Sequence, residues 1–164
     1  MNVFACHPDP AVSATWLADQ HVVKMTTESA QILSTVLHLR GVRSSWLYKP
    51  THQGHPCTVA AFNDQYYYSW VVLHGLALAG EYSERYGRQH SSEIVIKRAS
   101  VYQPPTHGTP RYWPLAMPEV FRKEDPHAAY CAYLQDKYDT WRQRGGRHAP
   151  RWVRVVAGNP FTSG

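Results

Sequence analysis

The stretch LADQHVVKMTTESAQILSTVLHL, residues 17–39, has the residue spacing of one long helix. At that spacing its apolar side chains fall on a single stripe, which comprises Leu17, Met25, Ile32, Val36 and Leu39. A stripe of this kind normally faces the core of a globular protein. We therefore predict a core helix here, and we interpret the glycine at position 41 as its stop signal.

Polar residues interrupt this stripe at His21 and Glu28, and Lys24 and Gln31 lie at its margin. Polar side chains on a core-facing stripe need internal partners or a cavity, because a buried charge without a partner is costly. Such places shift pKa values and are candidate functional sites. We predict that Glu28 lies at the floor of a cavity, with His21 within hydrogen-bonding reach or one water away. The alternative is a structural network in which His21 and Lys24 pair with Glu28 or Asp9.

Helix-start and helix-stop signals recur along the chain. Asp9-Pro10 and Asp125-Pro126 each join a side-chain acceptor for free backbone N–H groups to a proline whose fixed φ suits a first turn. Glycines at positions 41, 87 and 145–146 are stop signals. We expect helical regions at residues 10–40, with a break near 19, at 56–86, with a break near 63–64, at 91–101, and at 126–144.

Strand signals are few, so we predict an all-α (mainly helical) protein. The chain of 164 residues is close to the commonest domain size, and we expect residues 1–164 to form one single-domain helical bundle. Five prolines predict a long irregular loop over residues 102–118. Residues 145–164 are expected to form a basic, partly irregular tail.

Composition favours a globular protein that binds a polyanion. Apolar residues make up 43% and charged residues 18%, which is not the balance of a disordered chain. The net charge of +5 attracts polyanions, and the six Trp and eleven Tyr can stack on bases as well as fill a core. No apolar run approaches a membrane span and the start lacks a signal-peptide pattern. We expect DNA as the partner and a cytoplasmic location, in a bacterium or a phage-infected host; the oligomeric state stays open.

The string LADQH at residues 17–21, followed by Glu28, resembles the first helix of the phage endonuclease V family of pyrimidine-dimer DNA glycosylases. The resemblance implies a small all-α fold and a catalytic role for Glu28. It also implies that the N-terminal α-amine is the nucleophile, which forms a Schiff base with the deoxyribose C1′ of DNA whose base is flipped out. The family's arginine before the glutamate is Thr27 here, and the chain opens Met1-Asn2 where the family has a processed threonine.

Further motifs, covering nearly the whole chain, are similar to those of a group of small phage and bacterial proteins. They are MNxF, a DP pair, a D-x-H-V-V-K-M helix, a THxxHP loop, an EYxxRYG helix end and an LAMP segment, at residues 1–4, 9–10, 19–25, 51–56, 81–87 and 115–118. This similarity indicates a shared fold and an origin of the phage type, and it says less about the mechanism.

We predict a DNA-processing enzyme, an N-glycosylase and abasic-site lyase that acts on damaged or modified bases through an amine and a glutamate. The Met1 α-amine is the first candidate for the nucleophile. Lys24 is the second, and it would need its pKa lowered by a low-dielectric pocket. Glu28 would stabilise the positively charged sugar or move protons, and His21 would orient Glu28 or bind a phosphate. We expect no cofactor.

A wider set of polar, basic and aromatic residues is expected to bind the substrate: Asn2, His7, Asp9, Asp19, Gln31, His52, His55, Arg85, Arg147, Arg151 and Trp152. Arginines of the tail would hold the DNA backbone, and Trp152 would stack on an exposed base. Glu81 and Arg85 have the spacing typical of a surface ion pair. His52, His55 and Cys57 are metal-type ligands without a clear fourth, so a loop that bonds to backbone or reaches a phosphate is favoured over a metal site.

The alternative function is a nucleotide- or nucleic-acid-binding or modifying protein without lyase chemistry. The same helix would then hold a nucleotide, a modified base or an RNA end. Borohydride, which reduces a Schiff base to a stable bond, distinguishes the two functions, because only the lyase forms a covalent adduct with abasic DNA.

Overall fold

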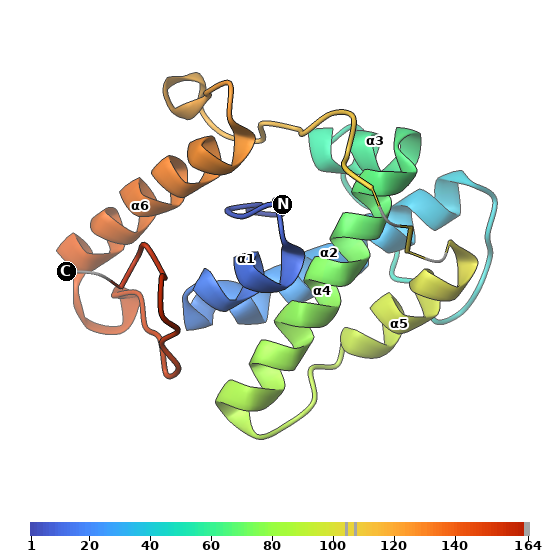
Figure 1. The fold of residues 1–164 in the computed structure, drawn as a ribbon. Helices are drawn as coiled ribbons and strands as arrows, with labels where there is room; N and C mark the ends of the chain where they lie inside the picture. The colour runs from blue at the N-terminus through green and yellow to red at the C-terminus, as the bar shows by residue number, and fades with distance from the viewer. Residues whose placement is uncertain (104, 107, 163–164) are drawn as a thin grey trace.

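The computed structural model describes residues 1–103, 105–106 and 108–162, and helices joined by irregular loops make up its regular structure (Figure 1). The elements are α1 (Pro10–Trp16), α2 (Asp19–Leu39), α3 (Pro56–Asn63), α4 (Gln65–Tyr86), α5 (Glu93–Tyr102), the 3₁₀ turn η1 (Glu119–Phe121), α6 (Pro126–Arg144) and the 3₁₀ turn η2 (Gly146–His148). These described residues contain no strand, which confirms the predicted all-α class. No helix among them is long and apolar enough to cross a membrane.

Side-chain caps begin three of the helices where the sequence predicted a start. The Asp9 carboxylate accepts the first free N–H groups of α1, and Asp125 does the same for α6. Asp64 separates α3 from α4 and caps α4, as the predicted break near residues 63–64 requires. Gly87 ends α4 with a φ of 64°, a left-handed conformation that only glycine adopts without strain.

The core is built around α2, which packs against α3, α4 and α5, while α1 packs on α4. The predicted stripe is buried over most of its length, at Leu17, Met25, Ile32 and Val36. Leu39 is an exception: it is the last residue of α2 and its exposed fraction is 43%, so the stripe ends one turn earlier than expected. Gly75 lets α4 come close, because a Cβ there would lie 3.0 Å from the Ser29 Cβ on α2.

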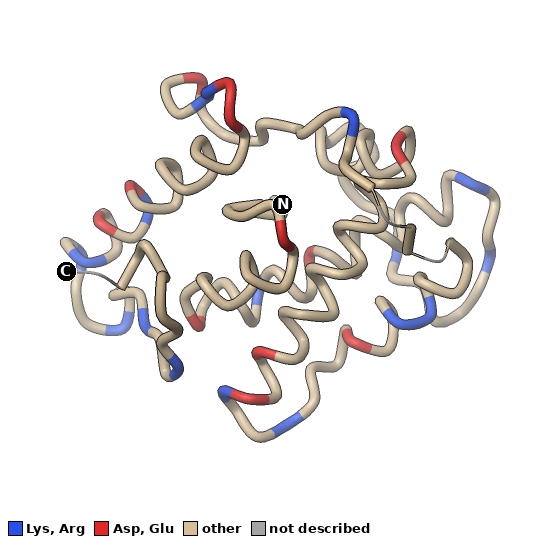
Figure 2. Tube along the Cα trace, in the orientation of Figure 1, with Lys and Arg blue, Asp and Glu red and all other residues tan. Residues whose placement is uncertain are grey.

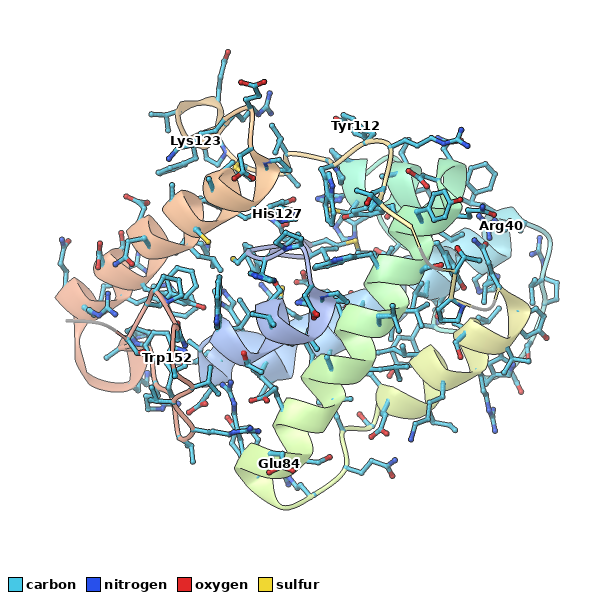
Figure 3. All side chains as sticks on the ribbon, in the orientation of Figure 1. Arg40, Glu84, Tyr112, Lys123, His127 and Trp152 are labelled. Atoms are coloured by element: carbon cyan, nitrogen blue, oxygen red, sulfur yellow. The ribbon has the colours of Figure 1, made fainter. Side chains whose placement is uncertain are left out.

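The N-terminal segment lies between α1 and α6 (Figure 1) and connects α6 to the body. His127 points towards this segment in Figure 3, and its Nδ1 lies 2.7 Å from the carbonyl oxygen of Ala5. The Cys131 thiol of α6 donates to the Cys6 carbonyl oxygen at 3.3 Å. These contacts hold the first residues of the chain against α6, which brings Met1 and Asn2 beside a helix more than 120 residues away.

The C-terminal segment beyond α6 returns to the start of α2. The Asp19 N–H donates to the Arg151 carbonyl oxygen at 2.7 Å, and the Trp152 indole donates to the Trp16 carbonyl oxygen at 3.0 Å. The described part of the predicted tail, residues 145–162, contains η2 and is otherwise irregular. It therefore packs on the body although it has little regular structure.

Candidate active site

A pocket of about 220 Å³ lies between the N-terminal segment, α2 and α6. It brings together four residues that the sequence analysis proposed as catalytic and a second group, from α6, that it did not. The lining residues are Met1, Asn2, Phe4, Gln20, His21, Lys24, Met25, Glu28, Tyr133, Lys137 and Trp141.

Glu28 reaches this pocket from α2 and has an exposed fraction of only 7%. Its Oε2 accepts the Asn2 backbone N–H at 2.7 Å and lies 3.9 Å from the Met1 α-amine. Its Oε1 lies 3.5 Å from the Lys24 ammonium, one helical turn away. The carboxylate is therefore fixed by a backbone N–H and faces two amines. The side-chain amide of Asn2 anchors this arrangement by donating to the Ala116 carbonyl oxygen at 2.7 Å.

Met1 is held by its side chain, which is only 1% exposed and whose sulfur accepts from the Thr58 hydroxyl at 3.9 Å. His55 lies close enough to the Met1 backbone to affect the pKa of its ring, and its Nδ1 accepts the Cys57 N–H at 3.2 Å. Burial lowers the pKa of His55, and the positive charges of the α-amine and of His52 lower it further, while the Glu28 carboxylate and the Met1 backbone act in the opposite direction. His55 thus borders the α-amine, although it is not among the pocket-lining residues.

His21 also lines the pocket, but its hydrogen bond is with α6 rather than with Glu28. Its Nδ1 lies 2.9 Å from the Tyr138 hydroxyl oxygen, and its ring lies 4.8 Å from the Trp141 ring. Two helical turns, about 10 Å along the axis, separate His21 from Glu28, which explains why the expected direct bond is not formed. Burial lowers the pKa of His21 to about 3, and the charge of Lys137 adds to this, so the ring is neutral near pH 7.

The α6 contribution was missed in the sequence analysis. Tyr133, Lys137 and Trp141 are four residues apart and therefore lie on one face of α6. The Lys137 ammonium lies 5.4 Å from the Tyr133 ring centre and 6.0 Å from the Trp141 ring centre. Burial lowers the pKa of Lys137, and the nearby charge of Lys24 lowers it further. The spacing of these three residues was the only available signal, and it is shared by many half-buried helix faces.

Asp19 and Arg85 lie outside the pocket, in a buried ionic network. The Arg85 side chain is fully buried and donates to Asp19 at 3.0 Å and to Glu81 at 3.0 Å. The same guanidinium donates to the carbonyl oxygens of Thr15 and Leu17. The surface position expected for the Glu81–Arg85 pair is wrong, because the body of the protein covers both side chains. Here the network fixes the junction of α1 and α2, which leads into the pocket.

Four other proposed substrate ligands, His7, Asp9, Gln31 and His52, do not line the pocket. His7 accepts the Asp9 N–H, Asp9 caps α1, and His52 lies 2.7 Å from the Thr51 hydroxyl. Gln31 is half-buried on α2, one turn beyond Glu28. In the described part of the chain, no group of three or more His, Cys, Asp or Glu side chains is placed to hold a metal ion.

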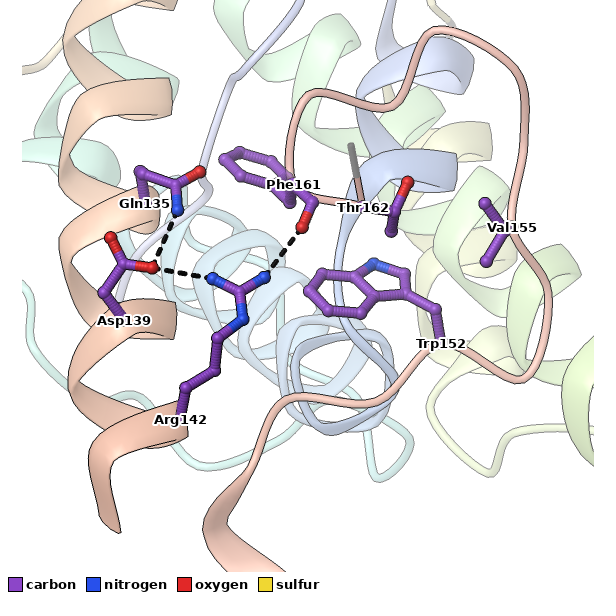
Figure 4. A pocket seen from close by; sticks show the side chains of 7 residues that line it. All are labelled: Gln135, Asp139, Arg142, Trp152, Val155, Phe161 and Thr162. Carbon is purple, nitrogen blue, oxygen red and sulfur yellow. Dashed lines mark hydrogen bonds and ion pairs between the residues drawn. The ribbon is translucent and has the colours of Figure 1, made fainter. Parts of the chain in front are cut away.

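A second cavity, of about 640 Å³, lies between α6 and the C-terminal segment, and Trp152 is one of the residues that line it (Figure 4). The Arg142 guanidinium there donates to Asp139 at 2.7 Å and to the Phe161 carbonyl oxygen at 2.8 Å. Basic residues gather at the end of α6 and in the C-terminal segment (Figure 2). Arg147 and Arg151 are exposed, and the Arg151 N–H donates to Gln20, which lines the Glu28 pocket. This basic surface therefore adjoins the pocket.

Residues 1–94 of the chain match the family described as pyrimidine dimer DNA glycosylase. The matched residues include the N-terminal segment, α2 and Glu28, and they end within α5; α6 lies outside them. No curated protein and no solved structure matches the chain.

Proposed function

The chain belongs to the pyrimidine dimer DNA glycosylase family, and on that premise we propose that it is an N-glycosylase and abasic-site lyase that removes a damaged or modified base from DNA. One observation carries the proposal. A nearly buried carboxylate, Glu28, lies 3.9 Å from the terminal α-amine at the wall of a pocket. An amine and a fixed carboxylate are the two groups that this chemistry requires.

The reaction begins with the neutral amine, whose nitrogen forms a bond to the sugar C1′. The glycosidic bond breaks at the same time, and the base leaves with the bonding electron pair. Positive charge develops on the sugar during this step, and the Glu28 carboxylate stabilises it more than it stabilises the ground state. As the sugar ring opens, one proton passes from the attached nitrogen to O4′, which gives a protonated Schiff base, C1′=N. Loss of a proton from C2′ then expels the 3′ phosphate by β-elimination.

The α-amine of Met1 is the favoured nucleophile. Burial of the Met1 side chain holds this amine in place, whereas the Lys24 side chain is 68% exposed. The low-dielectric surroundings that Lys24 would need are therefore absent. If Met1 is removed in the cell, the nitrogen of Asn2 becomes the terminal amine, and that nitrogen lies 2.7 Å from Glu28. Either N-terminus puts an α-amine beside the carboxylate.

We expect borohydride to trap a covalent adduct between the wild-type protein and duplex DNA that contains one abasic site. Reduction of the Schiff base makes the bond permanent, and mass spectrometry of the digested adduct should locate it on the N-terminal peptide. Lys24→Met should leave trapping within about threefold of wild type, because it leaves the α-amine untouched.

Two outcomes contradict parts of this proposal. An adduct on the peptide that carries Lys24 would contradict the role of the α-amine. If the protein binds abasic DNA but gives no adduct, lyase chemistry is excluded and the protein binds or modifies nucleic acid by other means. An N-terminal extension of a few residues serves as the matched test, since it keeps every side chain and removes the α-amine from the pocket.

The exposed arginines of the C-terminal segment are proposed to hold the DNA backbone. Replacing Arg147 and Arg151 together by Gln should weaken binding and reduce the slope of log K against log salt by up to about 2, since each phosphate contact contributes about 0.9. Arg154 is left unchanged because it pairs with Glu81 at 3.1 Å. Arg88→Gln, at an exposed site after α4, is the control. An unchanged slope in the double variant would contradict this role.

A further inference from the structure

We propose that Cys6 and Cys131 form a reversible oxidation site, at which a peroxide converts the two thiols into a disulfide that ties the N-terminal segment to α6. The two residues are called the Cys6–Cys131 pair below. The inference goes beyond the proposed function and does not depend on it, because neither thiol lines the Glu28 pocket. It is carried by the contact between the two residues, by their unequal exposure and by the way in which the chain holds Cys6.

The Cys6–Cys131 pair brings together two free thiols that are 125 positions apart in the sequence. The Cys131 Sγ lies 3.3 Å from the Cys6 carbonyl oxygen. The Cys6 thiol hangs from the same Cα as that carbonyl group, so the two sulfur atoms are near neighbours. Burial raises the pKa of Cys6, and Cys131 raises it further, an effect that requires the two side chains to lie close together. The two thiols are therefore placed to react with each other.

The two thiols differ in exposure, which gives each a different role. Cys131 is half-buried, so a small oxidant in solvent reaches it, whereas Cys6 has an exposed fraction of only 3%. The nearby Cys6 thiol lowers the pKa of Cys131, although burial of Cys131 acts in the opposite direction. The thiolate is the form of cysteine that reacts with a peroxide. Cys131 is therefore oxidised first, and Cys6 reacts with the product.

The reaction consumes one molecule of hydrogen peroxide for each pair. The Cys131 thiolate attacks one peroxide oxygen: an S–O bond forms, the O–O bond breaks and hydroxide leaves, which gives a sulfenic acid. The Cys6 sulfur then attacks the Cys131 sulfur. The S–S bond forms as the S–O bond breaks, and the departing hydroxide takes the Cys6 proton and becomes water. Two electrons thus pass from the sulfurs to the peroxide, and a dithiol such as dithiothreitol returns them.

The backbone around Cys6 is held from both sides. Its N–H donates to the Ser13 hydroxyl of α1 at 3.1 Å. On α6, His127 lies one turn before Cys131, and its Nδ1 lies 2.7 Å from the Ala5 carbonyl oxygen (Figure 3). Residues 5 and 6 thus contact two successive turns of α6. Because these contacts already fix the segment against the helix, a disulfide at this place requires little rearrangement of the backbone.

The test treats the reduced full-length protein with hydrogen peroxide, blocks the remaining thiols with N-ethylmaleimide and digests the product without a reductant. Mass spectrometry should find the peptides of Cys6 and Cys131 joined within one chain, and dithiothreitol should separate them. The oxidised protein should have a thermal midpoint about 5–15 °C higher, because the disulfide closes a long loop in the unfolded chain. Hydrogen exchange at residues 2–7 should become slower in the oxidised protein.

Three variants separate the roles of the thiols. Cys131→Ser keeps a donor for the Cys6 carbonyl oxygen, so it should fold like the wild type but give no linked peptide and no rise in midpoint. Cys6→Ala permits the first step and blocks the second, so a sulfenic acid should accumulate on Cys131, where dimedone labels it. Cys57 is fully buried, and burial raises its pKa to about 11, so Cys57→Ala should form the same disulfide as the wild type.

Any of three results overturns the inference. In the first, Cys131 of the wild type stays reduced or becomes a sulfinic acid, and no linked peptide is found. In the second, the linked peptides contain Cys57 or join two different chains. In the third, the disulfide forms but leaves the thermal midpoint unchanged, so that it does not tie the segment to α6. Borohydride trapping on abasic DNA tests the proposed function separately, since neither thiol takes part in it.

Discussion

Glu28→Gln is expected to lower the single-turnover rate of base excision by at least a hundredfold while leaving DNA affinity within about threefold of wild type. The substitution keeps the shape of the side chain, and its remaining oxygen can still accept the Asn2 N–H. It removes the negative charge that faces the developing charge on the sugar. Loss of one such electrostatic contact typically costs about 10²–10³ in rate. Rapid quench under excess enzyme, with anisotropy for binding, measures both quantities.

A purely structural Glu28 predicts a different pattern. In that case the carboxylate only anchors the Met1 α-amine and Lys24, and the glutamine variant should be destabilised while folded protein keeps its activity. Glu93→Gln is a matched control, because Glu93 pairs with Lys97 one turn along α5 as Glu28 pairs with Lys24. Measurement of the thermal midpoint on the same preparations decides between the two. A less stable Glu28→Gln protein with full activity at low temperature would exclude a catalytic role.

The helices could be predicted from the sequence because their signals are local. An aspartate before a proline caps a helix with atoms two or three residues away, and Asp9 and Asp125 do this. The stripe on α2 is local in the same sense, and it predicted that Glu28 is nearly buried. Leu39 shows the limit of such patterns, since spacing alone does not reveal where the neighbouring helices stop covering α2.

The surroundings of Glu28 could not be predicted in the same way. Its contact with Asn2 spans 26 positions, and the contact of His21 with Tyr138 spans 117. Such contacts depend on how the N-terminal segment and α6 pack, and no local pattern carries that information. Lys137 was missed for the same reason: a lysine between two aromatic residues on a helix becomes part of a pocket only when another element lies opposite it.

Arg85 shows how one spacing fits two structures. A glutamate followed four residues later by an arginine is usually a solvated surface pair. Here the pair is buried and not solvated, because Arg85 has a further carboxylate partner, Asp19, that is 66 residues away in the sequence. Arg85 also donates to the Glu81 carboxylate and to two backbone carbonyl oxygens, and together these partners compensate the burial of its charge. The identification of Asp19 and Arg85 as substrate ligands therefore remains a prediction, and their observed contacts favour a positioning role.

Arg85→Met is accordingly expected to destabilise the protein by about 3–5 kcal/mol, which corresponds to a fall of about 6–20 °C in the thermal midpoint. Methionine fills most of the volume, so the loss comes mainly from the two carboxylates left in a covered site. Asp19 and Glu81 have exposed fractions of only 2% and 6%. Arg142→Met is the control: it loses the pair with Asp139, which is 51% exposed and of a kind that contributes about 0–1 kcal/mol, and a hydrogen bond to the Phe161 carbonyl oxygen, but it leaves no carboxylate in a covered site.

A second substitution tests this explanation. If uncompensated charge is the cause, Asp19→Asn added to Arg85→Met should recover part of the lost stability, because a neutral amide is less costly to bury than a carboxylate. Recovery should be incomplete, since Asp19 also accepts the Val153 N–H with both oxygens, at 3.2 and 3.1 Å. The Glu81 carboxylate is still compensated in this double variant, because Arg154 pairs with it at 3.1 Å. A double variant less stable than Arg85→Met would mean that Asp19 stabilises the fold mainly by holding the C-terminal segment, and not by its charge pair with Arg85.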